Sequence, residues 1–394
     1  MTTPAVYTRP LRWIRFDPAR ILQPLADAKA AVYALAHTPF QRTWVERLQQ
    51  THFRIEIAGT VRMEGAEFTD AELEAAVRTD GGDELLTRSQ RQARAAAQAY
   101  GWIARLPADR PLTNALIRDI HRLVVTGCDD DGCEPGGLRG RGENVTFGAL
   151  PHRGVEGGPE CLGAFDSLVA GLLHQFREFD PLIQALAAHY HLASMHPFAD
   201  GNGRTARGVE SLLLQRAGLR DHAFVPMSNY YFENRPKYLK AMADARAADH
   251  ELTAFLEFGL SGIAVQCRRL LAEIRREMQK ALFRHTMREL YDRLEQTRKR
   301  AMGARQLRIL EALLESGEVA SDQLWRRVRG EYAPLKSPSK IYARDLMSLA
   351  SLRAIRVRKH DRPAMPARSM IGPNLEWPSE MTEAEFFRRI SRGS

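Results

Sequence analysis

The sequence predicts a mainly all-α protein. Along most of its 394 residues apolar side chains recur at helical spacing, strands and helices do not alternate, and no internal repeat is present. The longest segment without this spacing is rich in glycine and runs from 128 to 160. Its stretch 144–148, Asn-Val-Thr-Phe-Gly, has the β-branched and aromatic content of a short strand or hairpin. We therefore expect helices around one long loop that carries a small β-element.

The chain is long enough for two or three domains. Breaks in patterning and composition divide it into five segments, the first break being the polar, glycine-containing TDGGDE near residue 80. We expect a helical N-terminal region at 1–84, a second helical block at 85–262, an arginine-rich linker helix at 263–302, a third domain at 303–362 and a loosely ordered, proline-bearing tail at 363–394.

Composition excludes several classes of protein. With 44% apolar and 27% charged residues the chain resembles an ordinary folded protein rather than a disordered one. No apolar run approaches the roughly 18 residues of a membrane span, and the N-terminus lacks the apolar segment of an export signal. The scattered Cys128, Cys133, Cys161 and Cys267 favour free thiols, although the first two are near enough in sequence to close a loop or help to bind a metal. We expect a cytoplasmic protein without a membrane partner.

Positive charge is concentrated in the last third of the chain. From residue 266 onward there are 28 Lys and Arg residues against 16 Asp and Glu, a net +12, so the total of +9 leaves −3 for the first 265 residues. A basic C-terminal part fits an anionic partner, and a solvated basic face is the alternative.

The densest cluster of special residues is 196–207, with the sequence HPFADGNGRTAR. The helical pattern before it has Asp180 at the N-cap and Pro181 at the first helical position. The helical pattern after it ends at Gly218. The cluster therefore places its glycines at a helix N-terminus, where backbone N–H groups and the helix dipole favour an anion.

Five of these residues suit a phosphate chain. Glycine at 201 and 203, around Asn202, lets the backbone approach a ligand closely. Arg204 and Arg207 are three residues apart and share a helical face, where guanidinium groups can bind phosphate oxygens in pairs. The segment is therefore a candidate anion site.

Two more residues supply chemistry. Asp200 offers a hard oxygen ligand for Mg²⁺. His196, held before a proline, is suited to take a proton from an attacking hydroxyl. A dinucleotide fingerprint would need a preceding strand, and a P-loop would need a lysine after the second glycine. A plain helix–loop–helix with a core histidine would explain only Pro197 and Phe198.

Residues 196–207 match H-P-F-x-[DE]-G-N-G-R-x-x-R, the signature of the Fic family, at every specified position, and the resemblance extends over about 85–262. It implies a mainly all-α Fic fold with a β-hairpin flap and transfer of AMP from ATP to a protein hydroxyl. It implies that His196 is the catalytic base, that Asp200 holds Mg²⁺, and that the glycine loop and both arginines hold phosphates. The nucleotide-binding residues implied within the motif are Asp200, Gly201, Asn202, Gly203, Arg204, Thr205, Ala206 and Arg207.

Two flanking pieces follow from the same resemblance. The flap falls in the glycine-rich loop and would hold the target segment by strand-like pairing, with a solvent loop as the alternative. The adenosine pocket falls about 30 residues after the motif, where a plain amphipathic helix is the alternative. The residues so implied are Val145, Thr146, Phe147 and Gly148 for the flap, and Asn234, Tyr238 and Leu239 for the pocket.

An inhibitory motif precedes this block. The stretch 60–65, Thr-Val-Arg-Met-Glu-Gly, matches [ST]-x-x-x-E-[GN], which Fic proteins of the N-terminal (class II) kind carry ahead of the core. We expect Glu64 to form a bidentate ion pair with Arg207 and so to occupy the arginine that the γ-phosphate needs. Thr60 is the first residue of this motif, and a solvated Glu64 is the alternative.

The third domain resembles a winged helix, which many Fic proteins carry at the C-terminus. Apolar spacing predicts helices around 307–314, 324–328 and 340–346, followed by a strand that begins at 354. The third helix and the arginines around the strand suit phosphate contacts with DNA. Docking of a protein or of a second copy is the alternative.

Three functions remain open on this reading. The first is an autoinhibited protein adenylyltransferase that uses Mg²⁺ and ATP to modify a Ser, Thr or Tyr hydroxyl of an unknown protein target and of itself. The second is removal of AMP, or transfer of another phosphate-containing group, on the same scaffold. The third is a nucleotide-sensing, DNA-binding regulator. The oligomeric state stays open, although proteins of the Fic family often form homodimers through the core.

Overall fold

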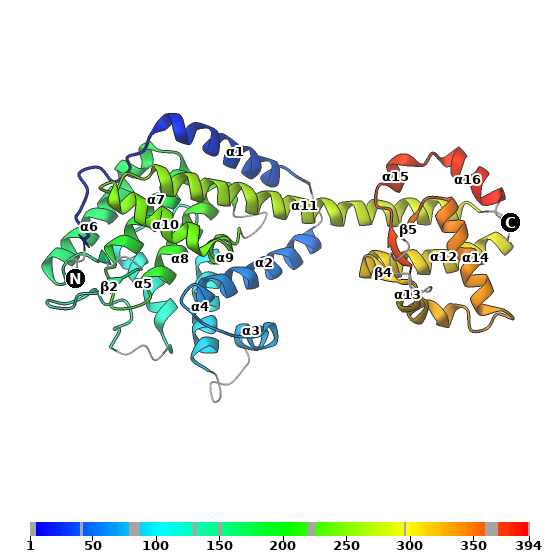
Figure 1. Cartoon of the computed structure of the whole chain (residues 1–394), viewed down its shortest axis with the longest axis horizontal. Helices are drawn as coiled ribbons and strands as arrows, with labels where there is room; N and C mark the ends of the chain where they lie inside the picture. The colour runs from blue at the N-terminus through cyan, green and yellow to red at the C-terminus, as the bar shows by residue number, and fades with distance from the viewer. Residues whose placement is uncertain are drawn as a thin grey trace. The chain divides into compact units, whose positions relative to one another are not determined.

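A computed structural model describes residues 5–39, 42–78, 87–128, 132–148, 152–219, 225–294, 297–358 and 369–392. The chain divides into two compact units, Met1–Leu271 and Ala272–Ser394 (Figure 1). The joint expected near residue 80 lies outside the described residues. Within the described ranges, no helix is long and apolar enough to cross a membrane.

The first unit is mainly helical. Its helices are α1 (Pro18–Ala36), α2 (Arg42–Arg62), α3 (Asp70–Val77), α4 (Arg88–Arg105), α5 (Asn114–Val125), α6 (Pro159–Leu173), η1 (Gln175–Glu178), α7 (Pro181–Met195), α8 (Asn202–Leu214), η2 (Gln215–Leu219), α9 (Met227–Glu233), α10 (Arg235–Ala247) and the first part of α11 (Thr253–Asp292). Side-chain caps fix where several of them begin. As the sequence predicts, Asp180 caps α7 by accepting a hydrogen bond from Leu182 N at 3.0 Å, with Pro181 next.

Helix α7 forms the centre of this unit. It is buried on all sides, and from Leu182 to Met195 only Gln184 is not in the buried class. It packs along α8, which in turn contacts α5, α4 and α2. The turn between α7 and α8 is therefore held by a buried helix pair, and elements distant in sequence converge on it.

Helices α2, α3 and α4 form a layer beside α8, as Figure 1 shows. Their shared core contains Ile57 and Val61 of α2, Leu73 of α3, and Ala93 and Tyr100 of α4. These buried side chains orient α2 so that its last turn points at the start of α8. The first 84 residues are thus packed into the same unit as the segment 85–262.

A small sheet lies beside the α7–α8 turn. It has the order β1 (Ala5–Val6), β3 (His152–Arg153), β2 (Thr146–Phe147). Strand β3 pairs antiparallel with β2 and parallel with β1. Within this sheet β2 is an edge strand, so one side of it is open to further main-chain pairing.

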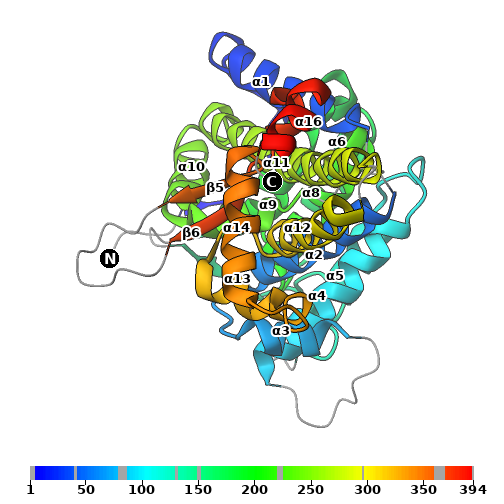
Figure 2. The same cartoon turned by 90° about the vertical axis from the view of Figure 1, so that its right-hand side faces the viewer.

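The second unit joins helices to an antiparallel sheet. Figure 2 shows α13, α14 and strands β5 and β6 together. Its elements are the second part of α11, α12 (Thr297–Ser316), β4 (Val319–Ala320), α13 (Ser321–Val328), η3 (Arg329–Glu331), α14 (Pro338–Ser351), β5 (Ile355–Arg358), β6 (Met370–Pro373), α15 (Trp377–Glu380) and α16 (Glu383–Arg392). The strand order is β4-β6-β5.

Two segments differ from the sequence-based expectation. The linker helix expected at 263–302 is observed as α11, which ends at Asp292, followed by α12, and Gly303 of α12 packs directly on the ring of Tyr291. The expected tail supplies β6, α15 and α16, and Trp377 is fully buried with its indole N–H donating to Leu352 O at 2.7 Å. Both contacts join residues distant in sequence, which apolar spacing within one segment does not reveal.

Candidate active site

His196 lies at the end of α7 in a left-handed conformation, with φ 53°. Its Nδ1 is 2.9 Å from Ala193 O, and because a carbonyl only accepts, this contact places the proton on Nδ1 and leaves a lone pair on Nε2. Phe147 of β2 stacks on the imidazole with ring centres 3.9 Å apart. Burial lowers the pKa of His196 to about 4. The ring is therefore neutral at pH 7 and able to accept a proton.

Arg139, which the sequence analysis did not single out, supports the segment that carries His196. It is buried, and its Nε donates to His196 O at 2.7 Å while Nη1 and Nη2 donate to Glu143 O at 2.6 Å and Val155 O at 2.5 Å. Gly154 allows this approach, since a Cβ there would lie 2.9 Å from the Cβ of His196. One guanidinium thus ties the glycine-rich loop to the candidate base.

The turn after His196 is closed by Asn202. Its Oδ1 accepts from Phe198 N at 2.9 Å, and its Nδ2 donates to Phe198 O at 2.8 Å. Gly201 has φ 73°, and a Cβ there would lie 2.5 Å from Val125 Cγ1, so both the conformation and the space require glycine. The Asn202 side chain therefore shapes the turn, and the ligand-facing groups of 201–203 are their backbone amides at the start of α8.

His121 of α5 is a second residue that the sequence analysis missed. Its ring stacks on Phe198 with centres 3.7 Å apart. Its Nδ1 accepts from Gly136 N at 2.9 Å, so Nε2 carries the proton and donates to Asp200 O at 2.9 Å. Burial lowers the pKa of His121 to about 4, which keeps it neutral in this role. His121 is thus a positioning residue for the turn.

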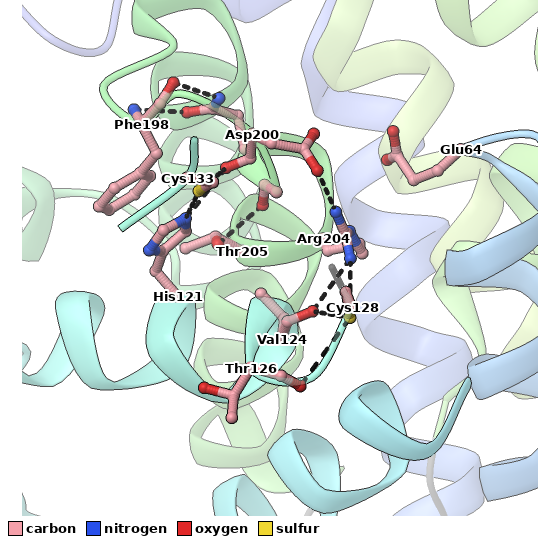
Figure 3. A network of polar contacts seen from close by, with 12 residues as sticks. Glu64, His121, Val124, Thr126, Cys128, Cys133, Phe198, Asp200, Arg204 and Thr205 are labelled. Carbon is pink, nitrogen blue, oxygen red and sulfur yellow. Dashed lines mark hydrogen bonds and ion pairs between the residues drawn. The ribbon is translucent and has the colours of Figure 1, made fainter. Parts of the chain in front are cut away.

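Arg204 and Asp200 form an ion pair across the first turn of α8 (Figure 3). Nη2 of Arg204 lies 2.7 Å from Asp200 Oδ2, while Nη1 donates to Val124 O at 3.0 Å and to Cys128 Sγ at 3.7 Å. The Arg204 side chain is 1% exposed, whereas that of Asp200 is 45% exposed. The Asp200 carboxylate is therefore open to solvent, while the Arg204 guanidinium is buried and held by Val124 O and Cys128 Sγ.

Arg207 meets the predicted inhibitory residues. Its Nη2 lies 2.6 Å from Glu64 Oε1 and donates to Thr60 O at 3.0 Å, and its Nε donates to Thr60 Oγ1 at 2.9 Å. The expected bidentate pair is not what forms, because Thr60 takes the Nε donor. Although desolvation acts to raise it, the pKa of Glu64 is lowered by Arg207, so this carboxylate is ionised at neutral pH.

Glu64 also lies against the start of α8. A Cβ on Gly203 would meet Glu64 Oε1 at 2.5 Å, so the carboxylate lies directly over this glycine of the first turn of α8. Figure 3 shows Glu64 facing this end of α8 from another part of the chain, the turn that follows α2. A carboxylate thus occupies the place where helix dipole and arginine together favour an anion.

The remaining predicted residues have mixed surroundings. Thr205 and Ala206 are almost completely buried, and Thr205 Oγ1 donates to Gly201 O at 2.8 Å. Tyr238 is buried with its hydroxyl 3.1 Å from His189 Nε2, whereas Leu239 is 41% exposed. Asn234 donates from Nδ2 to Tyr230 O at 3.0 Å. In the flap, Val145 O accepts from Gly154 N, Thr146 and Phe147 form β2, and Gly148 has φ 87°.

A metal ion bound here would rely on Asp200. Over the described residues, no group of three or more His, Cys, Asp and Glu side chains is arranged to hold one. The exposed carboxylate of Asp200 is a suitable oxygen ligand for Mg²⁺, which commonly takes one or two carboxylates and completes its shell with phosphate oxygens and water. The residues present therefore fit Mg²⁺ that arrives with a phosphorylated ligand.

Comparison with known proteins identifies the core of this site. Residues 111–214, which run from α5 through the glycine-rich loop and α7 to the end of α8, match the Fic/DOC family model. This segment is a Fic/DOC family domain. The Fic domain thus contains His196, Asp200, Arg204 and Arg207, while Glu64 comes from outside it.

Similar proteins include adenylyltransferases. The protein adenylyltransferase Fic of Culex quinquefasciatus is 38% identical over 102 residues, which are 25% of this chain and 19% of that protein. Protein adenylyltransferase fic-1 of Caenorhabditis elegans is 54% identical over 39 residues, or 10% of this chain and 8% of that one. The match therefore spans less than a fifth of the length of these curated relatives.

Solved structures share the fold. A Fic family protein from Desulfovibrio desulfuricans G20 has a TM-score of 0.54 at 18% identity and covers 95% of this chain and 99% of its own. Fic-1 of Caenorhabditis elegans, residues 134–508, has a TM-score of 0.55 at 20% identity and covers 65% of this chain and 73% of its own. At these identities the likeness concerns the fold.

Arg139 offers a test of how the site is supported. We expect Arg139→Met to lower the free energy of unfolding by about 2 kcal/mol or more, because buried carbonyl oxygens lose their donors. Urea denaturation followed by circular dichroism measures this. The control Arg141→Met removes an exposed arginine and should change stability by less than about 0.5 kcal/mol. Equal effects of the two variants would contradict the supporting role of Arg139.

Proposed function

We propose that this protein is an adenylyltransferase that transfers AMP from ATP to a Ser, Thr or Tyr hydroxyl of a protein target and of itself. The observation that carries the proposal is a neutral histidine with a lone pair on Nε2, next to a helix N-terminus flanked by two buried arginines. The adenylyltransferase names of the similar proteins support the reaction class.

The residues have distinct tasks in this reaction. His196 takes the proton from the attacking hydroxyl as its oxygen bonds to the α-phosphorus and pyrophosphate leaves in line. The amides of 201–203, with Arg204 and Arg207, hold the β- and γ-phosphates and stabilise the charge that develops on the leaving group. Asp200 would hold Mg²⁺, which would supply further charge neutralisation on the phosphates.

Two further surfaces position the reactants. The open edge of β2 pairs with an extended segment of the target and sets its hydroxyl beside His196, which Phe147 of the same strand contacts. Residues of α10, Tyr238 and Leu239, with Asn234 before it, receive the adenosine. Strand pairing uses main-chain groups, so it accepts targets of varied sequence.

The same geometry supports a class II brake. Glu64 occupies the anion position over Gly203 and neutralises Arg207. A γ-phosphate would need both, so productive ATP binding requires Glu64 to leave. The enzyme is therefore inhibited at rest, and movement of the last turn of α2 is the step that activates it.

Removal of the brake tests the reaction and its control together. With Mg²⁺ and ATP, we expect Glu64→Gly to gain one or more AMP units by intact mass, wild type to gain less, and Glu64→Gly/His196→Ala to gain none. The control Glu67→Gly alters an exposed residue three positions away and should behave as wild type. A folded Glu64→Gly that gains no more AMP than wild type would contradict the brake.

The pH dependence of AMP transfer by Glu64→Gly tests the role of His196 as the catalytic base. Because the pKa of His196 is lowered to about 4, the imidazole remains unprotonated in mildly acidic solution, down to about pH 5. We expect the transfer rate of Glu64→Gly to stay nearly constant from pH 8 to about pH 5 and to fall as His196 becomes protonated near pH 4. Initial rates with saturating ATP measure this. A rate that already falls between pH 7 and pH 6 would contradict the assigned role.

The second unit supports an additional function, which we propose as DNA binding by a winged-helix module. Helices α12, α13 and α14 with the three-stranded sheet have the order of such a module, in which the third helix enters the major groove. Lys340 and Arg344 lie on the exposed face of α14. The adjacent Arg356 and Arg358 pair with Glu376 and Glu318, and these ion pairs reduce the contribution of the two arginines to DNA binding.

Salt dependence separates this binding from general electrostatic attraction. We expect Lys340→Ala/Arg344→Ala to lower the affinity of the full chain for duplex DNA and to reduce the slope of log K against log salt by about 2. Fluorescence anisotropy at several salt concentrations measures both. The control Arg275→Ala/Arg276→Ala removes the same charge from exposed positions of α11. Equal losses in both double variants would contradict a role for α14.

A further inference from the structure

A buried carboxyl lies on α2, the helix that leads into the inhibitory motif 60–65 and is called the inhibitory helix below. This carboxyl does not belong to the motif itself. Glu56 is on α2, one turn before Thr60 and two turns before Glu64, and it is 2% exposed. Its Oε2 accepts from Ser228 N at 2.8 Å, and its Oε1 pairs closely with Ser228 Oγ. The inhibitory helix is therefore tied to the start of α9 by a group that can gain or lose a proton.

Gly59 brings the same two helices into backbone contact. A Cβ at this position would lie 2.4 Å from Asn229 N and 2.6 Å from Asn229 Cα. Only glycine permits this approach, because the obstruction is backbone, which cannot rotate away. The position of α2, and with it the reach of Glu64 to Arg207, is thus set where α2 meets α9.

The groups that surround Glu56 do not compensate a negative charge well. Tyr100 of α4 contributes a hydroxyl 3.4 Å from Ser228 Oγ, and the buried Glu210 of α8 and Tyr231 of α9 also face this region. Burial raises the pKa of Glu56 to about 7, the hydrogen bonds from Ser228 and Tyr100 oppose the shift, and Glu210 adds to it. Arg207, the buried cation of the neighbouring turn, is already paired with Glu64.

We propose that Glu56 and Gly59, docked on Ser228 and Asn229, form a latch that holds the inhibitory helix closed, and that loss of the Glu56 proton weakens it. This inference rests on the brake proposed above and names the signal to which that brake responds. When protonated, Glu56 donates to Ser228 Oγ and accepts from Ser228 N, so both contacts are satisfied without a buried charge. When ionised, it leaves a buried charge beside a second buried carboxylate, that of Glu210.

The direction of the pH effect follows from linkage. The docked state has the raised pKa of about 7, and the released, solvated state has the ordinary value of 4.5. Docking is therefore most favoured below pH 4.5, weakens as pH rises from there to about 7, and changes little above that. Between pH 5.5 and pH 7.5 the released fraction should rise on the order of tenfold.

Activity ratios test this without interference from the catalytic base. The auto-AMPylation rate of wild type divided by that of Glu64→Gly cancels any titration of His196, since both carry it. We expect this ratio to fall on the order of tenfold when pH is lowered from 7.5 to 5.5. In Glu56→Gln, whose uncharged amide can accept from Ser228 N and donate to Ser228 Oγ, the ratio should be low and independent of pH. A wild-type ratio that is equally flat would overturn the proposal.

Hydrogen exchange tests the latch apart from any activity. We expect the amides of 50–62 to exchange faster in wild type than in Glu56→Gln, by a factor that is on the order of tenfold larger at pH 7.5 than at pH 5.5. Comparing the two proteins at the same pH cancels the intrinsic exchange rates. Equal exchange at both values would overturn the proposal. If no variant transfers AMP while this difference is present, the proposed activity fails and the latch stands.

Gly59→Ala provides a test independent of pH. The added methyl should displace α2 and bring the activity close to that of Glu64→Gly at both pH values. The matched control is Gly163→Ala in α6, where a Cβ meets nothing within 4 Å and inhibition should remain. A folded Gly59→Ala that stays as inhibited as wild type would overturn the role of Gly59, and the Glu56→Gln measurements remain decisive if this variant does not fold.

Discussion

The tight turn between α7 and α8 is the constraint on which the site depends. Three residues separate the end of α7 at His196 from Asp200, and Gly201 then has no room for a side chain. Asn202 forms hydrogen bonds with both N and O of Phe198, so these backbone groups find their partners within the turn. The imidazole and the first amides of α8 are thereby fixed beside each other, and this proximity is what acid–base and electrostatic catalysis require.

Arg204 and Arg207 have similar surroundings, but the carboxylates that they bind differ in how they can respond to a phosphate. Each buried guanidinium donates to a backbone carbonyl, Val124 O or Thr60 O, and meets a carboxylate that is more exposed than itself. An incoming phosphate therefore meets the carboxylates first. Asp200 belongs to the same turn as Arg204, so it can remain and share a cation with the phosphate. Glu64 comes from 143 residues away, in the turn that follows α2, so in the proposed brake its removal requires the end of α2 to move.

The features that could be predicted from the sequence are those carried by contiguous stretches of residues. The cap at Asp180, the motif 196–207 and the inhibitory stretch at 60–65 are contiguous patterns, and each is visible without knowledge of the fold. Arg139 and His121 could not be found in this way, because their partners are carbonyls and amides that only the fold brings close. The strand β6 was missed for a related reason, since its four residues lie among prolines and become a strand only by pairing with β4 and β5.

In the proposed brake, nucleotide binding and loss of the Glu56 proton act on the same equilibrium between docked and released α2. Each pKa unit between 4.5 and about 7 corresponds to about 1.4 kcal/mol, so the Glu56 proton contributes at most about 3 kcal/mol to keeping α2 docked. A ligand that binds only the released form contributes about 2.7 kcal/mol at a hundredfold excess over its dissociation constant. The two contributions are comparable, so neither alone determines the state of the brake. In mildly acidic solution, the ATP needed to hold the enzyme open therefore rises in proportion to the tightening of the latch.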